Sequence, residues 1–472
     1  MSMKLGTMKM AVVAAFGYCS VALAAPPLQE AYVSNGFSVA AVGDLIVTQP
    51  IAAQMKRESP DLVKLLHSTD VTFGNFEETA IDMAHFKGHP QALSGGGWLV
   101  TPTTVPPNLS ELGFNLLSRA NNHATDWGVE GMLDTDAVLD KVGIVHAGTG
   151  KNLSAARAPR FLGTAAGRVS LIALSSSFTP MEPAIDALDE VPGRPGINAL
   201  HTTRYVLVPP ERLAQLAQIR DMQPAGSVEQ SVLEADKKNH TVTLFETKYQ
   251  ANSRPGAGNE LAFSFKMNEQ DRKEILKEVL QAKQTSDFVI VSNHNHQPGN
   301  FDSAPPDFMF QLAHDAIDKG ADEFIGHGPH QLRGIEIYKG KPIFYSLGNF
   351  FFMDNSQSVV TREEYEKTHT DPTSLTKAEF MEERRVSWIF KEQIWFESVV
   401  AISRFDQHGK VKEIQLYPVE LGWAGRDASR GIPHLAKGDD ARRILSHLKE
   451  LSEPLGTIIE IDKGIGVIRI PS

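Results

Sequence analysis

Apolar, strand-like runs alternate with amphipathic helical segments along most of this 472-residue chain. Residues 38–43 and 70–76 have strand character, whereas residues 129–142 and 307–319 repeat apolar side chains at helical spacing. Strands that alternate with helices are typical of layered α/β folds, because each helix covers an apolar face of a sheet. The pattern therefore predicts an α/β protein, with an antiparallel, strand-rich region after about residue 398.

A chain of this length can form one large α/β domain or two smaller ones, and two of its segments look inserted. We expect residues 38–425 to form one main domain, interrupted near 180–267 by a polar stretch rich in Pro and Gly and near 353–391 by a charged stretch. Long connections of this kind usually shape a site rather than a core. Residues 426–472 contain a helical pattern and a short strand, which we expect to pack on the same domain.

Residues 1–24 differ from the rest and predict a cleaved secretory signal peptide. Lys4 and Lys9 precede an apolar stretch that ends in Ala22-Leu23-Ala24, with small residues where signal peptidase requires them. The stretch is shorter than the ~20 residues that span a bilayer. We therefore expect a periplasmic or secreted protein with no stable membrane span in the mature chain; an uncleaved N-terminal anchor is the alternative.

Cysteine content and charge restrict the chemistry further. The single cysteine, Cys19, lies within the predicted signal peptide, so the mature chain would have neither a disulfide nor a thiolate metal site. Any metal must then be held by His, Asp, Glu or Asn. The net charge of −11 and the lack of a basic run argue against a nucleic-acid partner. An anionic substrate would need positive charge in the site, which metal ions could supply.

Five short segments place metal-ligand residue types directly after an apolar run. These residues are Asp44, the pair Asn75 and Glu77, the pair Asn122 and His123, the pair His294 and His296, and the pair His327 and His330. A single Asp or His at a strand end is more often a turn or cap residue. Five such segments, at the sheet edge where α/β folds collect their sites, instead indicate one shared site with enough oxygen and nitrogen ligands for two cations.

Several motifs in this order carry a family resemblance. They are Gly43-Asp44, Gly74-Asn75-Phe76-Glu77, Ala120-Asn121-Asn122-His123 with Asp126-Trp-Gly128, Gly326-His-Gly-Pro-His330 and Phe344-Tyr-Ser-Leu-Gly-Asn-Phe350. Together they resemble the CapA family of capsule and poly-γ-glutamate synthesis proteins, which is similar to the calcineurin-like metallophosphoesterases. The resemblance covers about residues 38–420. It implies a four-layer α/β/β/α sandwich with a dinuclear metal centre between its two sheets.

The resemblance also implies a set of metal ligands. Asp44 and His330 would belong to one metal, and Asn122, His294 and His327 to the other. The bridge would come from the second segment. Asn75 aligns with the usual bridging aspartate, but a neutral amide bridges two cations poorly, which favours Glu77 as the bridge.

The remaining residues would serve catalysis and substrate binding. His123 would be the general acid that protonates the leaving group. The candidate substrate-binding residues are Asn75, Arg119, Arg194 and His296. For Arg119, a surface or salt-bridged structural role is an equally open interpretation.

The chain departs from the metallophosphoesterase pattern at several positions. Ile46 stands where that pattern has a histidine, so one metal would lack a ligand and a single ion becomes an alternative to two. Gly328 replaces a second histidine of the last motif, and His294-Asn295-His296 replaces a histidine-tryptophan-glycine sequence. Because oxygen and nitrogen ligands suit Mn, Fe, Zn and Mg, the metal stays open.

Three functions are compatible with these features. The leading hypothesis is a secreted, metal-dependent hydrolase that acts in the synthesis, processing or export of poly-γ-glutamate or another capsule polymer. The alternatives are a periplasmic phosphoesterase and a non-catalytic, metal-containing protein that binds the polymer. The expected partners are an anionic polymer or a small anionic substrate, together with envelope polymer-synthesis machinery.

Overall fold

The structure is a computed structural model that describes residues 32–91, 97–256, 258–387, 391–425 and 429–470. The predicted signal peptide, residues 1–24, lies outside the described residues. Among the described residues, no helix is both long enough and apolar enough to cross a membrane.

The first large sheet combines parallel and antiparallel strands in the order β23-β24-β21-β20-β1-β2-β5-β6, with β19 beside β1 and β22 beside β21. Its parallel strands are β1 (Ser38–Ile46), β2 (Val71–Phe76), β5 (Leu116–Ser118), β6 (Val145–Ala147) and β19 (Asn349–Phe352). Its antiparallel strands are β20 (Glu397–Phe405), β21 (Val411–Glu420), β22 (His434–Leu435), β23 (Glu460–Asp462) and β24 (Ile465–Arg469). The antiparallel region expected after about residue 398 is therefore an extension of this sheet.

The second large sheet has the order β17-β18-β16-β15-β9-β8. Its parallel strands are β9 (Gly167–Ser175), β15 (Phe288–His294), β16 (Glu323–His327) and β18 (Lys341–Leu347). Two antiparallel strands, β8 (Arg160–Thr164) and β17 (Leu332–Tyr338), close its edges.

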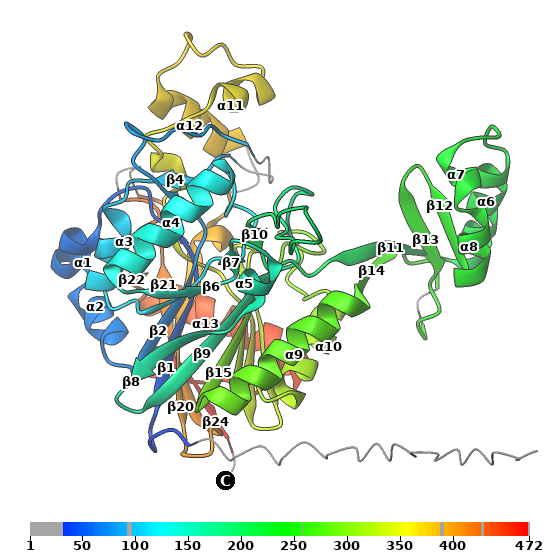
Figure 1. The fold of residues 1–472 in the computed structure, drawn as a ribbon. Helices are drawn as coiled ribbons and strands as arrows, with labels where there is room; N and C mark the ends of the chain where they lie inside the picture. Colours follow the sequence, from blue (N-terminus) through cyan, green and yellow to red (C-terminus); the bar gives the residue numbers. More distant parts are fainter. Residues whose placement is uncertain (1–31, 92–96, 257, 388–390, 426–428, 471–472) are drawn as a thin grey trace, which may run out of the picture.

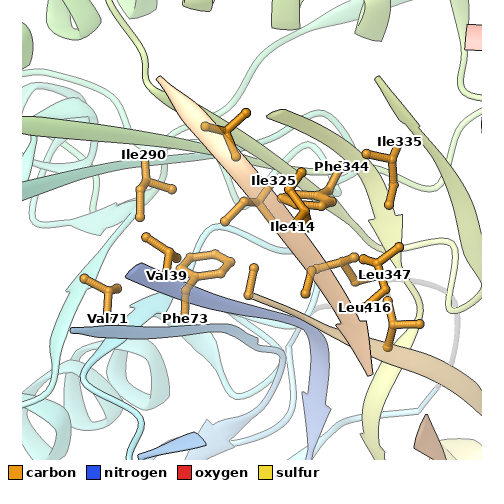
Figure 2. Packing of buried hydrophobic residues seen from close by; sticks show 14 of the residues in the cluster. Val39, Val71, Phe73, Ile290, Ile325, Ile335, Phe344, Leu347, Ile414 and Leu416 are labelled. Atoms are coloured by element: carbon orange, nitrogen blue, oxygen red, sulfur yellow. The ribbon is translucent and has the colours of Figure 1, made fainter. Parts of the chain in front are cut away.

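Apolar side chains of the two sheets pack against each other. In Figure 2, Val39 and Phe73 of the first sheet lie near Ile290, Ile325 and Phe344 of the second, and all five are completely buried. Burial of such side chains on both inner faces is the main favourable term that holds two sheets together.

Helices cover the outer faces of both sheets (Figure 1). The first sheet packs against α1 (Ala52–Glu58), α2 (Pro60–Leu66), α3 (Val105–Glu111) and α4 (Gly128–Val142). The second packs against α9 (Glu269–Thr285) and α10 (Asp307–Asp318). The predicted four-layer α/β/β/α sandwich is therefore confirmed. A further helix, α13 (Gly438–Ser452), packs against β17 and β21 and buries Ile444, Leu445 and Leu448 in the core between the sheets.

A small lobe projects from the sandwich within the segment expected to be inserted (Figure 1). Its sheet has the order β12-β13-β11-β14, formed by β11 (Thr202–Val208), β12 (Thr241–Leu244), β13 (Thr247–Ala251) and β14 (Ala262–Met267). Its helices are α6 (Pro210–Asp221), α7 (Val228–Ser231) and α8 (Leu233–Asn239). The strand β11 thus belongs to this lobe and not to the sandwich.

The other elements are short. The segment 353–391 contains η1 (Asp354–Ser356), α11 (Arg362–Lys367) and α12 (Lys377–Ser387), and η3 (Gln393–Phe396) follows it. Two small sheets pair β3 (Thr79–Ala80) with β4 (Val100–Thr101) and β7 (Thr149–Gly150) with β10 (Gly196–Ile197). The remaining helical turns are α5 (Leu153–Arg157) and η4 (Glu453–Leu455).

The strand register places the polar strand ends side by side. Asp44 of β1 pairs with Asn75 of β2, and His294 of β15 pairs with His327 of β16. The close approach of β1 to residue 348 requires glycine at position 43, since a Cβ there would lie 1.8 Å from the carbonyl oxygen of Gly348. The carboxyl ends of the parallel strands in both sheets therefore face one shared region, the usual place for a site in α/β folds.

Candidate metal centre

Asp44 connects the two sheets at this shared edge. It is completely buried, and its Oδ1 accepts a hydrogen bond from Asn75 Nδ2 at 2.8 Å while its Oδ2 accepts one from the backbone N–H of Gly328 at 3.2 Å. Burial raises the pKa of Asp44, but hydrogen bonding to His330 and the charges of His330 and His327 outweigh this and lower it to about 2. Asp44 is therefore a carboxylate at neutral pH.

Glu77 lies in the same buried cluster. Its Oε1 is 3.5 Å from His294 Nε2 and has no hydrogen-bond partner among the described residues. Burial, followed by the nearby charge of Asp44, raises the pKa of Glu77 well above its usual range. A buried carboxylate oxygen without a partner is costly, so this environment fits a cation beside Glu77.

A chain of amides fixes the orientation of Asn75. The backbone N–H of His123 donates to Asn121 Oδ1 at 3.1 Å, so Asn121 presents its Nδ2 to Asn75 Oδ1, also at 3.1 Å. Asn75 must then present its own Nδ2 to Asp44 and, at 3.4 Å, to Glu77 Oε2. Asn75 thus joins the two carboxylates by hydrogen bonds. Asn121 had no predicted role, although it belongs to the motif that identified Asn122 and His123.

Three histidines of the cluster have one ring nitrogen held by an outer partner. His327 Nε2 lies 2.6 Å from Ser292 Oγ, His296 Nδ1 lies 2.8 Å from Asn300 Oδ1, and His330 Nδ1 lies 2.9 Å from Asn349 Oδ1. Such contacts are typical of metal-ligating histidines, because they fix the tautomer and the ring orientation. None of the three outer partners was predicted, since each comes from a different part of the fold.

His294 lies at the middle of the cluster. Its Nδ1 is 2.9 Å from His327 Nδ1, and its Nε2 is 2.6 Å from Asn122 Oδ1 and 3.0 Å from His296 Nε2. Burial lowers the pKa of His327 to about 4 and that of His296 to about 3. The pKa of His294 is lowered well below its usual value by burial and, after it, by the charge of His296. The three imidazoles are therefore neutral, which is the form that binds metal.

The carboxylate and imidazole ligand atoms form two groups. In each group, all ligand atoms lie within 4.8 Å of one another. One group is Asp44, His294 and His327, and the other is Glu77, His296 and His330. Each supplies two imidazoles and one carboxylate, a donor set that suits Mn, Fe or Zn. The residues present therefore fit divalent cations. His330 Nδ1 also lies 3.5 Å from Asp44 Oδ2, and Glu77 Oε1 lies 3.5 Å from His294 Nε2, so the shared metal of Asp44 and His330 and the bridging role of Glu77 stay predictions.

A buried His–Asp pair lies next to this cluster. His123 Nδ1 is 2.7 Å from Asp126 Oδ2, which also accepts a hydrogen bond from the backbone N–H of Leu99 at 2.7 Å. Burial and, after it, the charge of His330 lower the pKa of His123 to about 3, so the ring is neutral and donates from Nδ1 to Asp126. Nε2 of His123 is then a proton acceptor. The motif containing Asp126 was recognised in the sequence, but this pairing was not.

Comparison with known proteins identifies the family. Residues 38–354 match the model of the bacterial capsule synthesis protein PGA_cap. The uncharacterized protein y4sH of Sinorhizobium fredii is 43% identical over 93% of this chain and 94% of its own length, and the PGA biosynthesis protein CapA of Bacillus subtilis is 26% identical over 71% of this chain and 69% of its own. The chain belongs to the bacterial capsule synthesis protein family. The predicted resemblance to CapA is thus confirmed.

A comparison with solved structures finds a distant neighbour of this chain. A crystal structure of a hypothetical protein from Thermus thermophilus covers 81% of this chain and 99% of that chain, with 12% sequence identity and a TM-score of 0.33.

Two residues expected to bind substrate make hydrogen bonds to backbone carbonyl oxygens. Arg119 is completely buried, and its Nη1 donates to the carbonyl oxygens of Phe76 and Glu78 at 2.8 and 2.7 Å. It therefore holds the backbone on either side of Glu77. Arg194 donates from two guanidinium nitrogens to the carbonyl oxygen of Pro183, at 3.1 and 2.9 Å, and so closes a turn within the first inserted segment.

Access to the centre is restricted to one side. Asp44, Glu77, His294 and His327 are completely buried, whereas the side chain of His296 is 23% exposed. Asn122, His123 and His330 are 4 to 5% exposed. A substrate would therefore reach the centre beside His296 and His123, the side on which the His–Asp pair lies.

Proposed function

We propose that this capsule synthesis protein is a periplasmic or secreted, metal-dependent hydrolase that acts on an anionic envelope polymer of the poly-γ-glutamate class during its synthesis, processing or export. The observation that carries the proposal is the position of the buried His123–Asp126 pair beside two groups of metal-ligand residues. The names of the CapA relatives, which refer to PGA and capsule biosynthesis, support the polymer as the substrate class.

Each group of residues would have a separate task. Bound divalent cations would supply Lewis acidity, lowering the pKa of a water and neutralising charge on the attacked group. Asp44, His294 and His327 would hold the cation nearest the middle of the cluster. His123 would hold the proton delivered to the leaving group, since an anionic substrate beside it favours its protonated form and Asp126 stabilises that charge.

Charge explains why an anionic substrate needs this centre. The chain has a net charge of −11, and the neutral histidines of the site add no positive charge of their own. An anionic polymer would be repelled until cations occupy the cluster. We therefore expect polymer binding to require added metal and to weaken as salt is raised.

The proposal is tested by loading the purified protein with Mn²⁺ and measuring the chain length of poly-γ-glutamate by size-exclusion chromatography. A chromogenic phosphodiester is assayed in parallel. We expect the polymer to shorten with the metal-loaded protein and not with His123→Ala, although that variant keeps its metal. His314→Ala serves as the matched control, because His314 lies on α10 and contacts Glu336 and Tyr338 of β17, which are not candidate ligands.

Other results would identify a different function. Turnover of the phosphodiester alone would indicate a phosphoesterase. Metal-dependent binding of the polymer with neither substrate cleaved would indicate a non-catalytic polymer-binding protein. Equal activity in wild type and His123→Ala would contradict the proposed role of the His–Asp pair.

A further inference from the structure

We propose that a groove between the small lobe and the loop after β15 binds an extended, amide-linked chain that bears carboxylates. The groove has a volume of about 680 Å³ and is lined by residues of β11, β14, the loop 298–306 and the start of α10. This volume lies within the range of roughly 300–1,000 Å³ that is usual for ligand sites. The inference rests on the proposed function, because the proposed polymer substrate belongs to this chemical class.

The groove lies close to the candidate metal centre. Pro298, which lines the groove, follows His296 by two residues, so their Cα atoms are at most about 7 Å apart. The loop is held by the completely buried Arg333, whose Nη2 donates to the carbonyl oxygens of Gln297 and Asp302 at 2.9 and 3.1 Å. A chain in the groove can therefore continue to His296, on the side from which a substrate would reach the centre.

Apolar side chains form much of the groove, and some of them are open to solvent. Leu261 and Phe263 of the lobe are 67% and 49% exposed, and the loop contributes Pro298 and Pro305. Exposed apolar side chains that gather in a groove often mark a binding site. The backbone of a γ-linked glutamate chain contains methylene groups in every unit, and these can cover such walls.

The free edge of β14 can pair with the amides of this chain. β14 is an outer strand of the lobe sheet, and antiparallel strands direct alternate residues to opposite edges. The backbone N–H of Phe265 donates to Asp307 Oδ1 at 2.8 Å, so Phe265 faces the free edge. Phe263, two residues earlier, therefore presents its N–H and carbonyl groups to the same edge. Such an edge binds extended chains through main-chain hydrogen bonds.

Positive charge favours an anionic chain in this part of the molecule. Residues 202–267 contain eight Lys or Arg and seven Asp or Glu, whereas the whole chain has 46 and 57. Arg254 lines the groove, and the guanidinium carbon of Arg204 lies 5.6 Å from the ring centre of Phe263. Neither arginine has an ion pair among the described residues. Carboxylates of the chain can therefore pair with these guanidinium groups.

Two acidic residues of the groove determine how the chain would lie. Asp307 accepts hydrogen bonds from Ser264 Oγ and from the backbone N–H of Phe265, and so holds α10 to the lobe. Asp302 Oδ1 accepts a hydrogen bond from the backbone N–H of Ala304 at 2.9 Å, and the carboxylate has further capacity to accept one from an amide. The carboxylates of the chain would therefore lie toward the arginines of the lobe and its amides toward Asp302 and β14.

The test is the binding of a fluorescein-labelled decamer of γ-linked glutamate to the full, Mn²⁺-loaded protein, measured by fluorescence anisotropy. Phe263→Ala should weaken binding about 10-fold, because the chain would cover its exposed ring. Arg254→Gln should weaken it about 3-fold, as expected for an exposed ion pair. Phe245→Ala and Arg212→Gln are the matched controls, since both residues are exposed on the same lobe outside the groove, and they should bind like wild type.

A decamer with N-methylated amides tests the pairing with β14, because it cannot donate main-chain hydrogen bonds. It should bind more weakly than the plain decamer, and equal binding would overturn the inference. Unchanged binding of the plain decamer by Phe263→Ala and Arg254→Gln would overturn it too. If circular dichroism shows that Phe263→Ala is unfolded, Leu261→Ala gives the same comparison at a more exposed position.

The outcomes separate the groove from the proposed function. Binding that is weakened in the groove variants, without any shortening of the polymer by wild type, would support the groove and overturn the hydrolase. Shortening of the polymer by wild type, with full binding and activity in the groove variants, would support the hydrolase and overturn the groove.

Discussion

The two sheets contribute different chemistry to the centre. The first sheet and the turns after its strands supply oxygen ligands and amides, which we call the oxygen side: Asp44, Asn75, Glu77 and Asn122. The second sheet and its following loops supply imidazoles, which we call the nitrogen side: His294, His296, His327 and His330. Each group of candidate ligands draws one carboxylate from the oxygen side and two imidazoles from the nitrogen side. Neither sheet alone can form either group.

Electrostatics also differ between the two sides. On the oxygen side the pKa of Asp44 is lowered to about 2 while burial raises that of Glu77, so two neighbouring carboxylates are pushed in opposite directions. On the nitrogen side, burial lowers the pKa of His294, His296 and His327 alike. A cation between the sides would favour an ionised Glu77 and neutral imidazoles together, so binding to Glu77 should release a proton.

The largest loss of metal binding and hydrolysis is expected when the carboxylate of Asp44, which contacts both sides, is removed. Asp44→Asn keeps the size of the side chain but loses the carboxylate that contacts Gly328 on the nitrogen side. We expect loss of the tight metal site and of hydrolysis, well beyond the roughly 10–100-fold effect of changes in outer partners. Metal content after dialysis measures this, with Asp318→Asn, which alters a surface ion pair with Lys339, as the control. Full retention of one tightly bound ion in Asp44→Asn would contradict this assignment.

The next effect concerns proton transfer and should leave both sides intact. His123→Ala should lower hydrolysis by about 100-fold or more, the usual contribution of a general acid. Asp126→Asn should cause a smaller loss, because the ring remains but its positive form loses a buried carboxylate partner. Both losses should shrink on substrates with an acidic leaving group, which needs no proton. An equal loss on all leaving groups, measured as kcat at saturation, would argue against an acid role.

A smaller loss of cation affinity is expected when an outer partner of a histidine on the nitrogen side is removed. Ser292→Ala removes the hydroxyl 2.6 Å from His327, and Asn300→Ala removes the amide 2.8 Å from His296. Each should weaken its own cation about 10-fold and leave the other unchanged. Calorimetric titration with Mn²⁺ resolves the two sites. If both variants weakened the same cation, the division of the nitrogen side into two groups would be wrong.

Local patterns predicted a layered α/β fold, whereas the four-layer sandwich was implied only by the family resemblance. β1, β2, β15 and β16 all lie where apolar runs end in polar residues, and the layered fold follows from their alternation with helices. The helix α9 was not predicted, although Ile275, Leu276, Val279 and Ala282 recur at helical spacing, because charged residues surround them. The lobe was expected only as an insertion, since its short strands carry little periodic signal.

The candidate site could be predicted from the sequence less completely than the fold. Its residue types were visible as strand ends, but their grouping depends on how two sheets pack and cannot be derived from spacing. His296 illustrates this, because its orientation depends on contacts with Asn300 at the ring and Ser177 at the backbone, which local spacing does not show. The chemistry of Arg119 was equally hidden, because only the fold reveals that it donates to backbone carbonyls beside Glu77.

A final prediction concerns the packing that brings the two sides together. Glu323 of β16 is completely buried, and its Oε1 accepts a hydrogen bond from Ser403 Oγ of β20 across the sheet interface at 2.9 Å. Burial raises the pKa of Glu323 to about 8, and the bond from Ser403 only partly opposes this. The folded chain therefore keeps a proton on this carboxyl at neutral pH, whereas the unfolded chain, near the ordinary pKa of 4.5, has lost it.

The sign of the resulting pH dependence follows from proton counting. Between about pH 4.5 and 8 the folded state binds one more proton than the unfolded state, so Glu323 lowers the free energy of unfolding as pH rises, by up to about 1.4 kcal/mol per pH unit. Glu323→Gln cannot ionise and should remove this contribution. Urea unfolding at pH 5.5 and 7.5 should therefore show a larger stability decrease in wild type than in the variant. The exposed control Glu363→Gln should show the same change of stability with pH as wild type. If wild type and Glu323→Gln showed the same change, Glu323 would be ionised in the folded chain and the prediction would be wrong.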